Sequence, residues 1–118
     1  MFDLEKFPVY LRSEEFLIDI EPVLVQSKLD RSIKDQLRRA SMSITLNIAE
    51  GAGKHSSNDK KHFYVIAHGS VNECVALLRI CKLQGFMDEE LYDRCYGNLE
   101  HISKMLSGLI RVMVVEKA

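Results

Sequence analysis

The sequence predicts an all-α fold, an antiparallel up-down four-helix bundle in a single domain spanning residues 1–118. Apolar residues recur at three- and four-residue steps over four stretches, and no stretch of comparable strength alternates as a strand would. The chain has only six glycines and two prolines, and its turn-forming residues gather at 26–32, 51–59 and 83–90. Connections this short favour antiparallel neighbouring helices.

The first helix is predicted over residues 9–25. Its apolar residues follow a seven-residue rhythm, at Val9, Phe16, Ile20 and Val23. Ser13 takes the remaining place in that rhythm. Pro22 lacks an N–H and clashes with the preceding turn, so we expect the helix to kink or end near it.

The second helix, predicted over residues 31–51, has the clearest pattern. A heptad seam runs through Ile33, Leu37, Ala40, Ile44 and Asn47, with Leu46 and Ile48 beside it. Asn47 stands where an apolar residue is expected, and Ser43 and Glu50 share its helical face. Because a buried polar group is costly unless it is hydrogen-bonded, we expect these residues to form a structural polar network that fixes helix register.

The third and fourth helices are predicted over residues 58–84 and 88–115. One side of the third carries Phe63, Ile66, Ala67, Ser70, Cys74, Leu77, Leu78 and Cys81. The matching stripe of the fourth is Leu91, Cys95, Leu99, Ile102, Leu106, Leu109 and Met113. Both stripes have the spacing of a helix face that packs into a core.

The string NIAEGAGKHSSNDKKH (residues 47–62) raises the question of a phosphate-binding loop. Such a loop needs Gly-Lys-Ser/Thr after a strand, whereas here His55 follows Gly53 and Lys54, and a helix precedes them. Glycines just past a helix are expected C-terminal caps in the left-handed conformation. Residues 56–58 then supply a cap for the next helix. The string therefore predicts a helix–loop–helix corner.

Several functional classes find no support in the sequence. The net charge is −1, no 18-residue apolar run exists, and the acidic N-terminus is not a signal peptide. We therefore expect a cytoplasmic chain whose three cysteines are reduced, with no membrane partner. Cys74 and Cys81 lie about two helical turns apart, too far to be adjacent ligands of one metal. We expect no cofactor and no metal.

Glu50 is the one candidate for a catalytic acid on the second helix. It has no His, Cys or second carboxylate within one helical turn in sequence, and a lone carboxylate makes a poor general acid–base centre. The sequence favours a structural role for Glu50, and we expect the protein not to be an enzyme.

The blocks QLRRASMSITLNIAEGAGK, FYVIAHGSVNECVALL and LEHISKMLSGLIRVM resemble the four helix bundle protein family. Its founding members are encoded in intervening sequences of bacterial 23S rRNA genes, and it has been called ribosomal-protein-like. The resemblance implies an up-down bundle that assembles as a homopentameric ring. It also implies a fold like that of the accessory subunit of diversity-generating retroelements, which partners a nucleic-acid enzyme. In this motif Gly69 and Ser70 would admit a close neighbour, adding Ser70 to the polar network within or between subunits.

The charge is uneven along the chain: residues 1–25 carry −4, residues 26–62 carry +4 and residues 63–118 carry −1. The candidate nucleic-acid contacts of the middle segment are Arg31, Lys34, Arg38, Arg39, Lys54, Lys60 and Lys61. The alternative is a solvated helix face in which Asp35 pairs with Arg38 and Arg39. In a ring, five copies of this segment would meet on one side and hold phosphates with a steep salt dependence.

Together these observations predict a non-enzymatic, oligomeric assembly or binding module that interacts weakly with structured RNA or another nucleic acid. A protein-interaction scaffold without nucleic-acid binding is the alternative. An enzyme that uses Glu50 is a second alternative, and it requires a solvent-reachable pocket around that carboxylate.

Overall fold

Four long α-helices and a short 3-10 helix make up the part of the chain that the structure describes, which is residues 1–117, with side chains through residue 113. In this computed structural model the elements are η1 (Asp3–Lys6), α1 (Pro8–Leu24), α2 (Arg31–Ala52), α3 (Ser57–Leu83) and α4 (Glu89–Lys117). The described residues contain no strand. The all-α prediction is confirmed, and each predicted helix boundary lies within two residues of the observed one.

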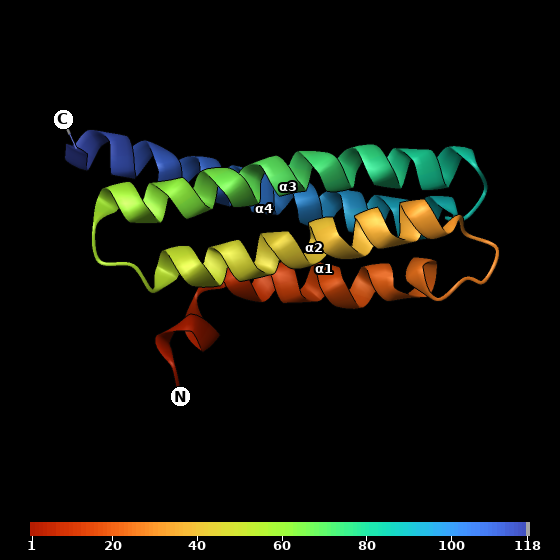
Figure 1. Cartoon of the computed structure of the whole chain (residues 1–118), viewed down its shortest axis with the longest axis horizontal. Helices are drawn as coiled ribbons and strands as arrows, with labels where there is room; N and C mark the ends of the chain where they lie inside the picture. Colours follow the sequence, from red (N-terminus) through yellow and green to blue (C-terminus); the bar gives the residue numbers. More distant parts are fainter. Residues whose placement is uncertain (118) are drawn as a thin grey trace.

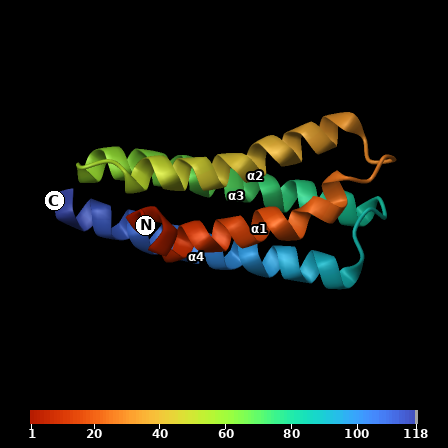
Figure 2. The ribbon, with the colours of Figure 1, turned by 90° about the horizontal axis from the view of Figure 1, so that it is seen from below.

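Successive helices run antiparallel, as the up-down prediction required (Figure 1). Each helix packs against two neighbours, and α1 closes the bundle by contacting both α2 and α4. Seen from below, α2 and α3 form one layer and α1 and α4 the other (Figure 2). The bundle measures 48 × 30 × 24 Å.

The two ends of the bundle differ. The connections α1–α2 and α3–α4 lie together at one end, which we call the closed end (Figure 1). The α2–α3 connection lies at the other end, where η1 leaves the bundle and projects from it. We call this second end the open end, and residues 1–7 the N-terminal arm.

Short polar side chains cap the starts of α2, α3 and α4. The Asp30 carboxylate accepts a hydrogen bond from the Ser32 amide (2.8 Å), and the Ser56 hydroxyl accepts one from the Asp59 amide (3.1 Å). Asp88 caps α4 in the same way. These bonds satisfy amide groups that have no partner within their own helix. Proline starts α1 at its first residue, and Pro22 stands two residues before the end of that helix.

Gly53 occupies the C-cap of α2, but not in the way the sequence suggested. Its φ is −83°, so the helix ends in a right-handed conformation, and the prediction of a left-handed glycine cap was wrong here. The left-handed glycine is Gly85, with φ 82°, which follows the C-cap residue Gln84 of α3. There the Phe86 amide donates to the Cys81 carbonyl (2.9 Å), which closes the end of the helix.

The core runs the length of the bundle. Its largest fully buried side chains include Phe16, Ile20, Leu37, Ile44, Ile48, Leu78, Leu99, Ile102 and Leu106. On α2 the buried stripe passes from Ile44 to Ile48 and Gly51, not to Asn47, which is only half-buried. A straight helix repeats every 3.6 residues, so a strict heptad drifts off the buried face. This drift carries Asn47 out of the core and Ile48 into it.

Candidate functional site

A small polar network joins the middle of α2 to α3. The Ser43 and Ser70 hydroxyls lie 2.8 Å apart, and Ser70 also donates to the Ile66 carbonyl (3.2 Å). The Asn47 amide donates to the Ser43 carbonyl (2.9 Å) and to its hydroxyl (3.0 Å). Because Ser43 accepts from Asn47, it has a proton to donate to Ser70. The structure thus brings together Ser43, Asn47 and Ser70 within one chain.

Glu50 stands apart from this network. Its side chain is exposed, and its carboxylate lies 3.7 Å from the Lys54 ammonium one turn along α2. An exposed ion pair of this kind contributes about 0.3–0.5 kcal/mol to a helix. The structure therefore gives Glu50 a surface pair with a lysine, and no second carboxylate or histidine within ion-pair or hydrogen-bond distance among the described residues.

The N-terminal half of α2 presents three exposed arginines, Arg31, Arg38 and Arg39. None lies within 4 Å of a carboxylate in the described chain, and Asp35 forms neither of the pairs expected of it. The half-buried Lys34 lies on the same half of the helix. This leaves three fixed positive charges facing solvent, each with a planar fork of donors suited to phosphate.

Two shallow hollows flank these arginines. One, of about 670 Å³, is lined by Asp35, Arg38, Arg39, Met42, Ser43, Leu46 and Asn47. The other, of about 580 Å³, is lined by Arg31, Ser32, Asp35, Gln36, Arg39 and Glu73. Asp35 and Arg39 lie between the two. The polar network reaches the first hollow through Ser43 and Asn47, so it borders the candidate interface.

The three other candidate contacts lie at the opposite end of α2. At a rise of 1.5 Å per residue, Lys54 is roughly 35 Å from Arg31. Lys54 pairs with Glu50 and lies 5.3 Å from the centre of the Phe63 ring. Lys60 donates to the carbonyls at the end of α2, and Lys61 is half-buried beside it. The seven predicted basic residues therefore form two separate groups and not one patch.

The cysteines are buried free thiols. Burial raises the pKa of the Cys74 and Cys95 thiols to about 12, so both stay protonated at neutral pH. Among the residues whose placement is described, no group of three metal-ligating side chains comes together. No described helix is both long enough and apolar enough to cross a membrane.

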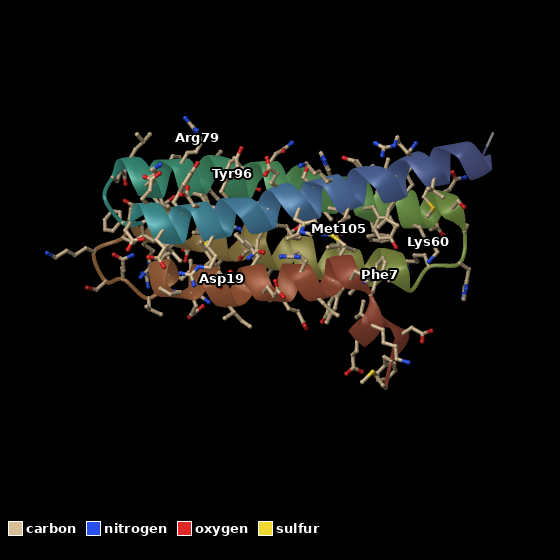
Figure 3. All side chains as sticks on the ribbon, turned by 180° about the vertical axis from the view of Figure 1, so that it is seen from behind. Phe7, Asp19, Lys60, Arg79, Tyr96 and Met105 are labelled. Carbon is tan, nitrogen blue, oxygen red and sulfur yellow. The ribbon has the colours of Figure 1, made fainter. Side chains whose placement is uncertain are left out.

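A cleft of about 740 Å³ opens at the open end, and the sequence did not indicate it. The N-terminal arm and Pro8 form one wall, the ends of α2 and α3 another, and Leu109 and Met113 of α4 a third. In Figure 3, Phe7 and Lys60 are labelled at this end of the bundle. The lining is mostly apolar, with Lys6, Lys60 and Asp3 as its charged members.

The profile of the 23S rRNA-intervening sequence protein family matches residues 5–108 of the chain. The chain belongs to this family. Among solved structures, a protein of unknown function from the S23 ribosomal protein family of Bacteroides thetaiotaomicron is 25% identical, with a TM-score of 0.79 over 86% of this chain and 97% of that one. No curated protein matches the sequence.

Family membership confirms the resemblance drawn from the three sequence blocks. Arg38, Arg39, Asn47 and Gly51 belong to the first block, which forms most of α2. The matched range, residues 5–108, includes only the last three residues of the N-terminal arm but nearly all of the helical core. The family therefore shares the bundle, while neither comparison assigns a function to any of these side chains.

Tyr64 is the residue that the sequence reasoning missed most clearly. Its ring is 2% exposed and packs against Gly51, where a β-carbon would stand 2.6 Å from the ring. A signal was available: Tyr64, Ala67, Val71, Cys74, Leu78 and Cys81 step by three and four, and all are buried. The stripe predicted from Phe63 includes Ile66, which is 39% exposed.

Proposed function

We propose that this family member is a non-enzymatic, cytoplasmic binding and assembly module whose α2 arginines contact the phosphates of structured RNA. The observation that carries this proposal is the set of three exposed guanidinium groups without carboxylate partners beside two hollows. Arginine binds phosphate through paired N–H groups, and contacts to phosphate do not depend on base sequence. The link of the family name to 23S rRNA points to the same class of partner.

The interaction is expected to be weak and strongly dependent on salt. The whole chain carries a net charge of −1, so only the local arginine cluster attracts a polyanion. Each phosphate that is neutralised contributes about 0.7–0.9 to the slope of log affinity against log salt concentration. Three arginines per chain therefore give a slope of roughly −2 to −3 for each bound copy.

A titration against structured RNA and duplex DNA at low and physiological salt tests the proposal. The variant Arg31→Gln/Arg38→Gln/Arg39→Gln should lose most of the affinity and most of the salt dependence. Its matched control is Arg79→Gln/Lys104→Gln/Arg111→Gln, which removes three exposed positive charges from α3 and α4. Equal losses of affinity in the two variants would mean that RNA binding depends on net charge and not on the α2 arginines. Absence of RNA binding even at low salt would contradict the proposal.

Self-association is the second part of the proposal. Met42 and Leu46 are 46% and 56% exposed on α2, and Val65 and Ile66 are exposed on α3. Apolar side chains gathered on a surface favour contact with another protein surface. We propose a homopentamer, in which five copies of the +4 segment would act together on one nucleic acid. Light scattering should give five times 13.5 kDa, and a 13.5 kDa species at micromolar concentration would contradict this.

A protein-interaction scaffold is the second candidate, and one observation favours it. Met42 and Leu46 line the same hollow as Arg38, so an acidic peptide with apolar side chains would suit it. This candidate predicts that the hollow binds a polypeptide while the protein ignores RNA at every salt concentration. The RNA titration above therefore separates the two.

A further inference from the structure

The cleft at the open end combines an apolar interior with two polar side chains, Lys60 and Tyr64, that can each donate a further hydrogen bond. Its volume of about 740 Å³ lies within the range of small-molecule sites, and Leu4, Phe7, Leu109 and Met113 supply apolar walls. The α2 arginines form no part of the lining, so the cleft is separate from the proposed RNA interface.

Lys60 supplies a cation at this cleft. Its ammonium group is half-buried and donates to the Gly51 carbonyl (3.3 Å) and the Ala52 carbonyl (3.1 Å). An ammonium has three donors, so one remains after these two bonds. No carboxylate of the described chain lies within 4 Å of it. A partly buried cation without a counter-ion favours an anionic group beside it.

Tyr64 supplies the second polar group, one helical turn from Lys60 on the same face of α3. Its side chain is nine-tenths or more buried and lines the cleft, yet its hydroxyl forms no hydrogen bond with the described residues. Burial raises the pKa of this hydroxyl, which keeps its proton available for donation. The hydroxyl retains some solvent access at the cleft, so a ligand oxygen there can accept its proton.

Gly51 holds these two groups in one place. The Tyr64 ring packs where a Gly51 side chain would stand, and the Lys60 ammonium binds the Gly51 carbonyl. The Tyr64 ring and the Lys60 ammonium therefore contact the same residue of α2, beside the apolar cleft. This arrangement matches a ligand that is apolar along most of its length and negatively charged at one end.

We propose that the cleft binds a single-chain amphiphile with an anionic headgroup, the head on Lys60 and Tyr64 and the chain among Leu4, Phe7, Leu109 and Met113. A carboxylate head and a phosphate head present the same chemistry to these donors. Dodecanoate and dodecyl phosphate distinguish them as probes. The proposal concerns a site distinct from the arginines of α2 and does not depend on RNA binding.

Calorimetric titration of the full chain with dodecanoate, below its critical micelle concentration, tests the proposal. We expect saturable binding of one ligand per chain, which tightens up to about fourfold for each methylene added from octanoate onward. Dodecyltrimethylammonium, with the same chain and a positive head, is expected to bind at least about tenfold more weakly. Equal affinity for the cationic probe, or no saturable binding of either anionic probe, would overturn the proposal.

Matched variants locate the site. Tyr64→Phe removes only the hydroxyl and should weaken dodecanoate binding about fivefold, while Tyr92→Phe at the closed end should leave it unchanged. Lys60→Met removes the charge and keeps an apolar side chain, and we expect a loss of about tenfold or more. Circular dichroism confirms that each variant is folded. If both α3 variants bind as the unchanged chain does, the headgroup is held elsewhere and the assignment is wrong.

Discussion

The closed and open ends of the bundle are built from the same four helices, but they differ in how completely they are covered. At the closed end, Leu29 is 4% and Met87 is 6% exposed, and the Gln26 side chain donates to the Phe86 carbonyl (2.7 Å). At the open end, Phe2 is 80% exposed and a cleft of about 740 Å³ lies beside it.

Because of this difference, the closed end contributes more to the stability of the bundle, and the open end is better suited to binding a ligand. Loop residues at the closed end are buried against the core, so they add to the free energy of unfolding. Apolar groups at the open end line a cavity and are only partly covered, so they contribute less to stability and remain available to a ligand. The exposed arginines lie in the N-terminal half of α2, which begins at the closed end (Figure 1).

The largest expected effect tests this contrast directly. Leu29→Ala removes a buried side chain from the closed end and should lower the free energy of unfolding by about 2–4 kcal/mol. Phe2→Ala removes a larger side chain from the arm and should change it by no more than about 0.5 kcal/mol. Urea denaturation followed by circular dichroism measures both. Similar losses would mean that the arm is part of the core.

Substitution of two glycines tests the close packing of Tyr64 against Gly51 at the open end. Gly51→Ala places a methyl group 2.6 Å from the buried Tyr64 ring, and the resulting strain should cost about 1–3 kcal/mol of stability. At Gly69, also in a helix, a β-carbon meets nothing within 4 Å. Gly69→Ala should stabilise the chain by about 0.5–1 kcal/mol, because alanine loses less entropy in a helix. Thermal melts of both variants should move in opposite directions.

A buried thiol in the core should make the free energy of unfolding depend on alkaline pH. The pKa of the Cys95 thiol is raised from 9.0 to about 12 by burial, so its stabilising effect is complete below pH 9 and declines as pH rises toward 12. Between pH 8 and pH 10 this thiol alone should lower the free energy of unfolding by about 1.4 kcal/mol. Denaturation of Cys95→Ala at both pH values gives the contribution of Cys95 by difference.

A cysteine in the arm provides the matched comparison. Phe2→Cys places a thiol at an exposed position, and it should react with a thiol reagent at pH 8 within the dead time of mixing. The three native thiols should react only as fast as the chain opens. Rapid labelling of Cys95 in the native chain would contradict its complete burial in the core.

The smallest effect concerns an isolated defect on α2. The Thr45 hydroxyl is buried and has no hydrogen-bond partner among the described residues. Thr45→Val replaces it with a methyl group of similar shape, and we expect a gain of about 0.5–1 kcal/mol. Ser41→Ala is the control, because the Ser41 hydroxyl donates to the Arg38 carbonyl (3.0 Å) and its loss should not stabilise. A loss of stability in Thr45→Val would mean that the Thr45 hydroxyl forms a stabilising hydrogen bond, which contradicts the defect.

The helices could be predicted because each carries its own periodic apolar pattern, and α2, α3 and α4 also begin with a polar cap. The register of the polar network was only partly predictable. Asn47 and Ser43 lie one turn apart on α2, and that spacing follows from the sequence alone. The pairing of Ser43 with Ser70 depends on how α2 and α3 pack, which spacing along one helix does not determine. Glu50 shares this face of α2, but its side chain is exposed and lies 3.7 Å from Lys54, so it forms no bond with the network.

The open-end cleft could not be predicted from any local pattern. It forms where the arm, two helix ends and α4 meet, from residues separated by up to about a hundred positions in the chain. Tyr64 lay within reach of the periodicity argument, but its contact with Gly51 required a tertiary structure. The ion pairs expected for Asp35 failed for a different reason: correct spacing permits such a pair, while solvent and side-chain entropy oppose it.

The most direct test of the account is a set of amide proton–nitrogen spectra of one sample, titrated first with structured RNA and then with dodecanoate. RNA should perturb residues 31–43 of α2, while dodecanoate should perturb residues 49–64 and the N-terminal arm. Saturation of the two sites should be independent. Perturbation of one shared set of residues by both ligands, or of neither set by its own ligand, would contradict the division of the bundle into two binding regions.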